Sequence, residues 1–271
     1  MGKSEGINLE FSSMLEIDYL NKLIQLRKSK GGGFYGHKAN HVILKDGEYV
    51  GDLFSLIEIA IKDYGIEDAE IANAALFDRM ATDNLLKAAK GTGRPTVFLD
   101  LRIEGVNGYE PLGTLFIELF EDLCPKASEN FALLCTGERG RDPKTDVTLS
   151  YEGSPVHRVV PGGWLQAGDI LDGSGNHSIS AFGGTFEDEC FSVDFNCLIG
   201  GILGYSSNGP HSNGSQFFIT LGPCEYLNLN KVGFGRVIHG YSVLREIEKV
   251  PCSYERPTKN IIIHSCGKYV I

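Results

Sequence analysis

The stretch of residues 157–169 reads HRVVPGGWLQAGD, and its pattern predicts β-structure. Its apolar residues belong to two short runs, near residues 155–160 and 164–170, with Pro-Gly-Gly between them. Short apolar runs bounded by proline and glycine are typical of β-strands joined by turns. The stretch therefore predicts two strands, and the abundance of glycine, 34 of 271 residues, favours many more turns.

The same pattern covers most of the chain after residue 94. Apolar residues alternate with others over residues 97–103, with the period of two that a strand shows. Further strands are expected near residues 115–119, 198–205, 215–221, 232–238 and 261–264. One helix is expected from Pro125 to about Cys135, since proline suits the first helical position, and a short one around residues 241–247. Many antiparallel strands with two helices indicate a mainly β fold, closed into a barrel without exposed strand edges.

The first part of the chain, residues 1–93, predicts a small α/β appendage to the barrel domain, residues 94–271. Ser13 and Glu16 fit a capping box, which predicts a helix that runs to about Arg27. The sequence KGGG at residues 30–33 is expected to follow as a flexible connection.

A hairpin and two helical segments are expected to complete the appendage. Asp46-Gly47 is a strong turn pair and predicts strands at residues 41–44 and 48–51. Apolar residues recur at helical spacing over residues 53–64, and a second helical segment is expected over residues 66–90. A hairpin followed by a helix resembles the last part of a thioredoxin-like domain. Because the Cys-x-x-Cys motif is missing, no redox chemistry is expected of this segment. Its expected role is to dock onto a partner.

Composition excludes several classes of function. The formal net charge is −10, which disfavours binding to the phosphate backbone of nucleic acids. No stretch of 18 apolar residues occurs, so no membrane span is expected, and the N-terminus lacks the apolar core of a signal peptide. The seven cysteines include no Cys-x-x-Cys pair, so buried reduced thiols are expected in place of a disulfide framework or a metal site.

Five motifs from residue 120 onward carry the strongest functional signal. In chain order they are 120–131 (FEDLCPKASENF), 136–140 (TGERG), 157–169, 186–189 (FEDE) and 213–220 (NGSQFFIT). In this order they resemble the cyclophilins, a family of peptidyl-prolyl cis-trans isomerases, over about residues 95–268. The resemblance implies an eight-stranded antiparallel β-barrel capped by two helices, and a reaction without cofactor or metal.

The resemblance also implies a catalytic site. A peptide bond rotates over a barrier of about 18–20 kcal/mol because its C–N bond has double-bond character. Arg158 matches the family's catalytic arginine, which donates a hydrogen bond to the prolyl nitrogen and so stabilises the twisted transition state. Gln166 matches the glutamine that bonds the substrate backbone. Substrate binding is implied for eight further residues: Trp164, Ser206, Ser207, Gln216, Phe218, Tyr226, Leu227 and Lys231.

Several positions depart from the family pattern. Gly163 stands where a pocket phenylalanine is usual, Trp164 where methionine is common, and Lys231 where a histidine helps to close the pocket. These changes retain the arginine and alter the grip on proline, so a reduced activity is expected. His157 is expected to make a buried structural hydrogen bond and not to act as a base.

The loop at residues 141–150 leaves two alternatives open. It resembles the longer loop of the divergent-loop cyclophilins, which accompanies two cysteines, here Cys135 and Cys266. A redox switch is one interpretation, and a solvent-exposed insertion is the other.

Two functions remain open. The first is an enzyme of the cytoplasm that acts on Xaa-Pro bonds of proline-containing protein clients. The second is a largely non-enzymatic, proline-peptide-binding or structural subunit of a large assembly such as the ciliary axoneme. It is suggested by the appendage, the altered pocket strand and residues 250–257, which resemble a cyclophilin subgroup associated with motile cilia. The partners would then be axonemal or microtubule-associated proteins, with no nucleic acid and no membrane.

Overall fold

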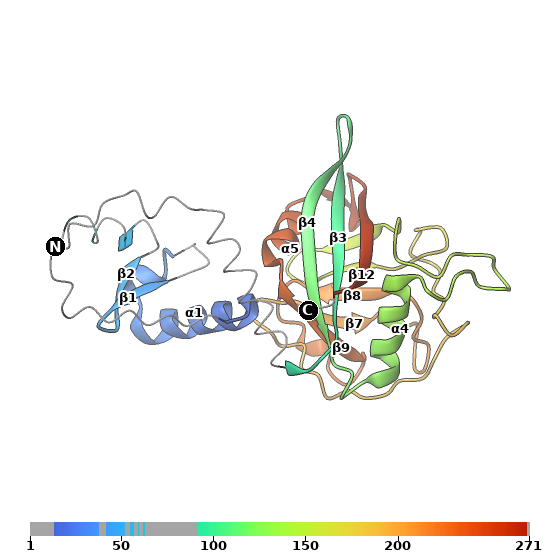
Figure 1. The fold of residues 1–271 in the computed structure, drawn as a ribbon, viewed down its shortest axis with the longest axis horizontal. Coiled ribbons are helices and arrows are strands. Elements are labelled where there is room, and N and C mark those ends of the chain that lie inside the picture. The colour runs from blue at the N-terminus through green and yellow to red at the C-terminus, as the bar shows by residue number, and fades with distance from the viewer. Residues whose placement is uncertain are drawn as a thin grey trace, which may run out of the picture. The chain divides into compact units, whose positions relative to one another are not determined.

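The computed structural model describes residues 14–37, 42–51, 55, 56, 59, 62 and 92–269. The chain divides into two compact units, Met1–Gly91 and Thr92–Ile271 (Figure 1). Most of the helix expected over residues 53–64, and all of that expected over 66–90, lies outside the described residues. No helix among the described residues combines the length and the apolar character needed to cross a membrane.

The first unit contains a helix and a hairpin. Helix α1 spans Glu16–Lys30 and follows Leu15, which makes no side-chain cap, so Glu16 does not take the third helical position of the expected capping box. Ser13 lies outside the described residues. Strands β1, Ile43–Lys45, and β2, Glu48–Gly51, form the expected antiparallel hairpin. Asp46 and Gly47 both have positive φ, 54° and 82°, which confirms the predicted turn.

The glycine segment after α1 is not the flexible connection expected from the sequence. Residues Gly32–Phe34 form a 3₁₀ turn, η1, and the guanidinium of Arg27 donates to the carbonyl oxygens of Phe34 and His37. A Cβ on Gly33 would collide with the ring of Tyr49, so glycine is required there by packing. The His37 ring in turn lies between the hydroxyl groups of Tyr19 and Tyr49. Burial raises the pKa of Tyr19 to about 12.

The second unit is built on one eight-stranded antiparallel sheet, as expected. Its strands are β3 (Thr96–Gly105), β4 (Gly108–Leu119), β5 (Val156–Val160), β6 (Trp164–Ala167), β7 (Ile202–Tyr205), β8 (Phe217–Thr220), β9 (Gly233–His239) and β12 (Ile261–Lys268). Their order across the sheet is β12-β3-β4-β9-β7-β8-β6-β5. Every strand predicted for this part of the chain has a counterpart. The end of the long β3–β4 hairpin projects from the sheet (Figure 1).

The expectation of a closed barrel was wrong in one respect, because the strand ladder does not close. The edge strands β5 and β12 are joined, among the described residues, by an isolated bridge between Pro155 and Ile262. Next to it, Gly153 donates its backbone N–H to Ile263, which donates its own to Ser154. A two-stranded ribbon that the sequence did not predict, β10 (Cys252–Ser253) and β11 (Arg256–Pro257), lies outside the sheet.

Two helices pack on this unit where the sequence placed them. Helix α4 spans Pro125–Thr136, and α5 spans Tyr241–Glu248 with its apolar residues buried. The ring of Phe131 on α4 lies 5.0 Å from those of Tyr151 and Phe217, and 5.3 Å from that of Phe234. Helix α4 therefore packs against strands β8 and β9 through an aromatic core.

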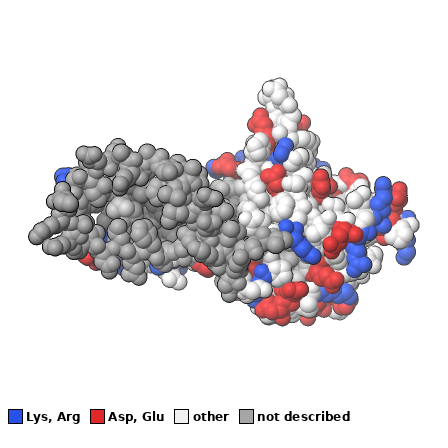
Figure 2. Space-filling view, viewed as in Figure 1, with Lys and Arg blue, Asp and Glu red and all other residues white. Residues whose placement is uncertain are grey.

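The insertion at residues 141–150 is mostly exposed but held by its own bonds. The carboxylate of Asp142, which is buried, accepts the N–H groups of Lys144 and Thr145 and the Thr145 hydroxyl. Those bonds lower the pKa of Asp142. Charges of both signs mix over the visible face of the second unit, as Figure 2 shows.

Asn130 joins α4 to two distant segments. Its amide donates to the Tyr205 hydroxyl at 2.8 Å and to the Gly214 carbonyl at 2.9 Å, and its oxygen accepts the Ala181 N–H at 2.8 Å. The side chain is fully buried. Replacing Asn130 with an apolar residue leaves its polar partners buried without a hydrogen bond. Each such group lowers the free energy of unfolding by about 1–3 kcal/mol.

We therefore expect Asn130→Ala to lower the free energy of unfolding of this unit by about 2–4 kcal/mol. The only tryptophan of the chain, Trp164, lies in the unit, so its fluorescence in a urea titration measures the change. Asn176→Ala, at an exposed asparagine, is the control and should change stability by less than about 0.5 kcal/mol. Equal losses in both variants would contradict the role given to Asn130.

Candidate active site

Three side chains expected at the site form one row across the sheet. Arg158 on β5 pairs with Gln166 on β6, and Gln166 pairs with Phe218 on β8. Directly paired residues of antiparallel strands project on the same face, so the register brings these side chains together. Trp164 lies two residues before Gln166 and so shares that face.

Arg158 is held by two contacts. Its Nε donates to the carboxylate of Glu255 at 2.7 Å, and its guanidinium carbon lies 5.3 Å from the centre of the Trp164 ring. The second contact is a cation–π interaction. The side chains of Arg158 and Glu255 are 41% and 47% exposed, so a ligand in solution can reach them. Among the described residues, no acceptor bonds the two terminal nitrogen atoms of Arg158.

Two glutamines fix one another beside Arg158. Gln166 donates its Nε2 to the Oε1 of Gln216 at 2.7 Å. Gln216 donates its own Nε2 to the carbonyl oxygens of Gly175 and His177, each at 2.9 Å. Because the amide nitrogen of Gln166 is engaged, its carbonyl oxygen remains as an acceptor. Gln166 can therefore accept an N–H from an extended peptide.

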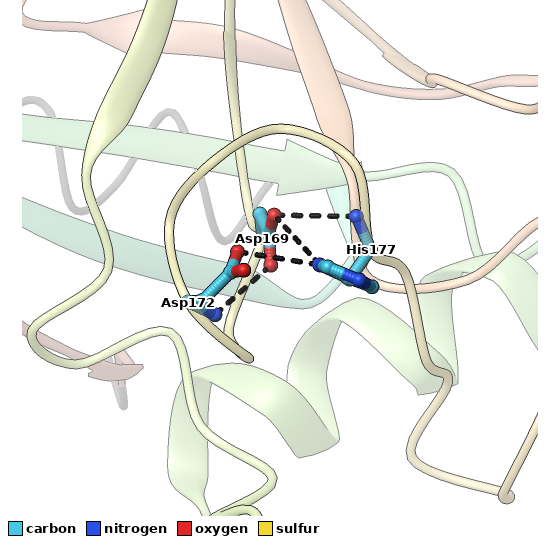
Figure 3. Close-up of side chains that lie close together, drawn as sticks. All are labelled: Asp169, Asp172 and His177. Carbon is cyan, nitrogen blue, oxygen red and sulfur yellow. Dashed lines mark hydrogen bonds and ion pairs between the residues drawn. The ribbon is translucent and has the colours of Figure 1, made fainter.

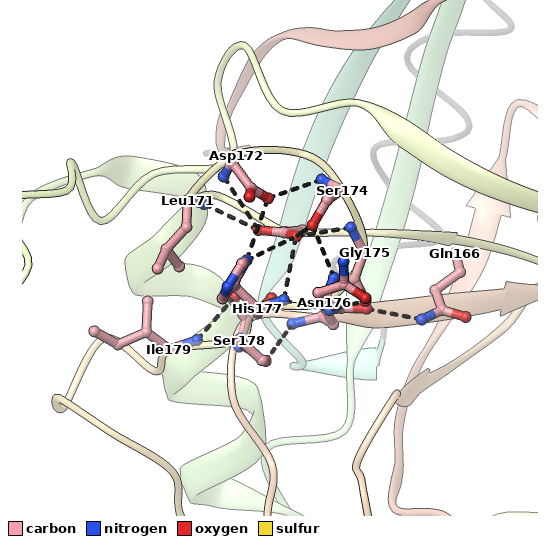
Figure 4. A network of polar contacts seen from close by, with 12 residues as sticks. Gln166, Leu171, Asp172, Ser174, Gly175, Asn176, His177, Ser178 and Ile179 are labelled. Carbon is pink, nitrogen blue, oxygen red and sulfur yellow. Dashed lines mark hydrogen bonds and ion pairs between the residues drawn. The ribbon is translucent and has the colours of Figure 1, made fainter.

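The loop that carries those carbonyl groups includes the residues labelled from Leu171 to Ile179 in Figure 4. It is organised by one buried carboxylate, that of Asp169. Its oxygen atoms accept backbone N–H groups from Leu171 at 3.1 Å, Gly175 at 2.8 Å and His177 at 3.2 Å. The Ser174 hydroxyl donates to it as well. Asp169 therefore fixes the loop whose carbonyl groups accept the hydrogen bonds of Gln216.

The same loop brings together three possible metal ligands, although their sequence spacing had indicated none. One ligand atom each of Asp169, Asp172 and His177 lies within 4.8 Å of the others (Figure 3). Both oxygen atoms of Asp169 already accept hydrogen bonds from the loop. A bond from the Ser174 N–H and the nearby His177 ring lower the pKa of Asp172. We assign the cluster a structural role in the loop.

The apolar part of the site lies next to this polar row. Phe218 is only 3% exposed and belongs to a buried cluster with Phe195, whose ring centre lies 5.5 Å away. Trp164 and Leu227 are partly buried against the same cluster. Tyr226, 61% exposed, lies beside Trp164 at 6.3 Å between ring centres. Phe218 thus forms the floor of an apolar surface, and Trp164, Tyr226 and Leu227 form its margin.

The altered positions have structural consequences. The indole of Trp164 contacts Arg158, while a Cβ on Gly163 would come within 3.2 Å of the Val160 side chain. Lys231 donates its Nζ to the carbonyl and the hydroxyl of Ser207, at 2.6 and 3.2 Å. Burial lowers the pKa of Lys231. The Lys231 ammonium group is therefore held by hydrogen bonds to Ser207.

The last of the expected binding residues, Ser206, is half-buried, and its backbone N–H donates to the Gln216 carbonyl. Sequence reasoning missed two residues of the site. Phe195 and Glu255 belong to none of the five sequence motifs, so no motif indicated them. The one signal was the 255–257 sequence, Glu-Arg-Pro, interpreted only as a subgroup feature.

Two pairs of cysteines lie close together as free thiols. Burial, and then a hydrogen bond with Cys266, raises the pKa of Cys135, while that bond lowers the pKa of Cys266. The sequence had singled out this pair, and its redox role stays a prediction. The sulfur atoms of the second pair, Cys124 and Cys190, are 2.8 Å apart and were not foreseen.

Several known proteins are similar to this chain. The family profile described as "Cyclophilin type peptidyl-prolyl cis-trans isomerase/CLD" matches residues 99–268. The Homo sapiens protein named "Probable inactive peptidyl-prolyl cis-trans isomerase-like 6" is 42% identical over 221 residues, which are 82% of this chain and 67% of that protein. Its Bos taurus counterpart is 42% identical over 219 residues, 81% and 68% of the two chains. "Peptidyl-prolyl cis-trans isomerase cyp11" of Rhizopus delemar is 39% identical over 178 residues, 65% and 51% of the two chains.

The first two alignments cover 219 and 221 residues and are longer than the whole second unit, Thr92–Ile271. The likeness to the isomerase-like 6 proteins therefore reaches into the first unit. It confirms the resemblance to that subgroup expected from the sequence.

His157 has the buried position expected of it but not the hydrogen bond. Its side chain is 6% exposed, and neither ring nitrogen has a hydrogen-bond partner in the part of the chain that the structure describes. Burial lowers the pKa of His157 below its usual 6.5, although the charge of Asp169 opposes this. The folded protein therefore binds a proton at His157 less readily than the unfolded chain does.

This difference predicts a pH dependence of stability. Below about pH 6.5 the unfolded chain binds the proton, so stability should fall as the pH falls, by up to about 1.4 kcal/mol per pH unit. Urea unfolding at pH 7 and 5.5, followed by Trp164 fluorescence, measures the slope. His157→Leu should flatten it, and His264→Leu, at an exposed histidine, should not. Equal slopes in the wild type and in His157→Leu would contradict the assignment.

Proposed function

The chain belongs to the family of cyclophilin-type peptidyl-prolyl cis-trans isomerases, and on that premise we propose that its second unit isomerises Xaa-Pro bonds of protein clients, with weak turnover. One observation carries the proposal. Arg158, Gln166 and Phe218 stand in one row, and the terminal nitrogen atoms of Arg158 have no other acceptor among the described residues.

The row offers the three contacts that the reaction needs. Phe218 provides an apolar floor for the proline ring, and the Gln166 oxygen accepts a backbone N–H of the peptide. A guanidinium donor on the prolyl nitrogen withdraws its lone pair from conjugation with the carbonyl, which lowers the barrier to rotation. The bond is stronger in the twisted transition state than in the planar ground state, so it accelerates the reaction.

The weak turnover is proposed from the altered margin of the site. Gly163 offers no ring, Trp164 is engaged with Arg158, and Lys231 presents a cation tied to Ser207. Proline is therefore gripped on fewer sides. The relatives named "probable inactive" fit a low activity, whereas the Rhizopus relative is named without that qualifier.

A second candidate is a binding or structural subunit of a large assembly in the cytoplasm, such as the ciliary axoneme. Two observations favour it. The likeness to the isomerase-like 6 proteins extends into the first unit, beyond the isomerase domain. Tyr226, on the margin of the site, is 61% exposed, so it is free to contact a proline-rich segment of an axonemal or microtubule-associated protein.

The first proposal predicts the effect of removing the guanidinium. Arg158→Ala should lower kcat/KM about 10- to 100-fold, the cost of one hydrogen bond from a charged donor in the transition state. Exchange spectroscopy on a proline-containing peptide measures the rate, and Arg245→Ala, at an exposed arginine of α5, serves as the control. Equal rates in the wild type and in Arg158→Ala would refute the assignment.

The second proposal predicts the effect of removing the first unit. Deletion of residues 1–93 should release the protein from axonemes into the soluble fraction, because that unit would carry the docking surface. The second unit should stay folded and keep its isomerase activity, as Trp164 fluorescence and the peptide assay would report. Retention of the shortened protein on axonemes would show that the anchor lies elsewhere.

A further inference from the structure

We propose that Glu255 is a positioning residue for Arg158, and that its carboxylate orients the guanidinium whose terminal nitrogen atoms meet the prolyl peptide. The proposal rests on the isomerase function proposed above. It is suggested by the single hydrogen bond that the described residues make to the Arg158 side chain, from Nε to the Glu255 carboxylate at 2.7 Å.

Glu255 reaches Arg158 from outside the sheet. It lies in the two-residue turn of the β10–β11 ribbon, where Ser253 pairs with Arg256. Its carbonyl oxygen accepts the backbone N–H of Val159, at 2.7 Å, on the free edge of β5. The ribbon is also fixed by Arg256, which donates to the Ser174 carbonyl at 2.7 Å. Glu255 is thus attached to β5 through both its backbone carbonyl and its side-chain carboxylate.

The turn itself does not explain a glutamate at this position. Tyr254 and Glu255 both have positive φ, 50° and 66°, a conformation that glycine and asparagine adopt far more readily. Two residues with large side chains are therefore unfavourable there. Tyr254 is fully exposed, but the Glu255 side chain has a specific contact. That contact gives the glutamate a role that glycine could not fill.

The direction of approach determines what the contact does. Gln166 and Phe218 lie on one side of Arg158, across β6 and β8, whereas Glu255 comes from the free edge on the other side. A guanidinium is planar, with its donors in a fixed fork. Engaging Nε on the outer side leaves the terminal nitrogen donors for a peptide bound over Gln166 and Phe218. The Trp164 ring, 5.3 Å from the guanidinium carbon, further restricts the side chain.

An ordinary surface ion pair is the competing interpretation. Both side chains are about half exposed, and such pairs contribute little to stability because water and salt screen them. A surface pair would leave the reaction rate unchanged. A positioning residue changes kcat more than KM, because it acts on a contact that matters most in the transition state.

Two substitutions separate the carboxylate from the turn. Glu255→Gly removes the carboxylate and suits the positive φ, so the protein should remain folded and at least as stable. We expect kcat to fall about two- to fivefold, with little change in KM. Glu255→Gln keeps an oxygen that can accept the Nε proton, so kcat should fall less than in Glu255→Gly. Tyr254→Asn relieves the same turn without touching Arg158 and should leave kcat unchanged.

The test uses the full chain, with both constants measured on a proline-containing peptide. In an Arg158→Ala background, Glu255→Gly should cause no further loss, because the glutamate acts through the arginine. An unchanged or increased kcat in Glu255→Gly would overturn the proposal. A further loss in the Arg158→Ala background would do so as well.

A second readout does not depend on activity. If the wild type and Arg158→Ala isomerise the peptide equally, the proposed function fails, and the NMR signal of the Arg158 Nε proton then decides the positioning role. A signal protected from solvent exchange in the wild type and lost in Glu255→Gly supports that role. Rapid exchange in the wild type, or equal protection in both proteins, overturns it.

Discussion

The register between β5, β6 and β8 is the constraint on which the site depends. Side chains alternate between the two faces of a strand, so a shift of one residue would move Arg158 or Gln166 to the opposite face. The pairs Arg158–Gln166 and Gln166–Phe218 keep these residues on one face. On the other face, Phe217 packs against Phe131 of α4. The aromatic core therefore fixes the position of the polar row.

Polar groups refine what the register sets. The Asp169 carboxylate gathers the N–H groups of its loop, whose carbonyl groups orient Gln216 and, through it, Gln166. A buried carboxylate that accepts several N–H groups is well compensated for its loss of water. The result is a chain of contacts from a loop carboxylate to the proposed substrate acceptor, in which each amide has a determined orientation.

The sequence predicted local structure well because local rules decide it. The alternation of apolar residues predicted β3, Pro125 predicted the start of α4, and Asp46-Gly47 predicted the turn of the first hairpin. The motifs indicated Arg158, Gln166 and Phe218. Contacts between distant segments obey no such rule, so the order of the strands, the Glu255 contact and the packing of Phe195 were not foreseen. The ordered η1 segment was also missed, because three successive glycines ordinarily indicate a flexible backbone. Here the absence of a side chain at Gly33 allows close packing with Tyr49.

The isolated bridge between the edge strands has a consequence for local unfolding. Pro155 has no N–H to donate, so the seam between β5 and β12 is held by the bonds between Ile263 and the Gly153–Ser154 segment. Regions with few backbone bonds open at lower free energy than the interior of a sheet. We expect amide protons along this seam to exchange with solvent before those of β4 and β9. Because β5 carries Arg158, opening of this seam would begin beside the strand that bears the proposed catalytic group.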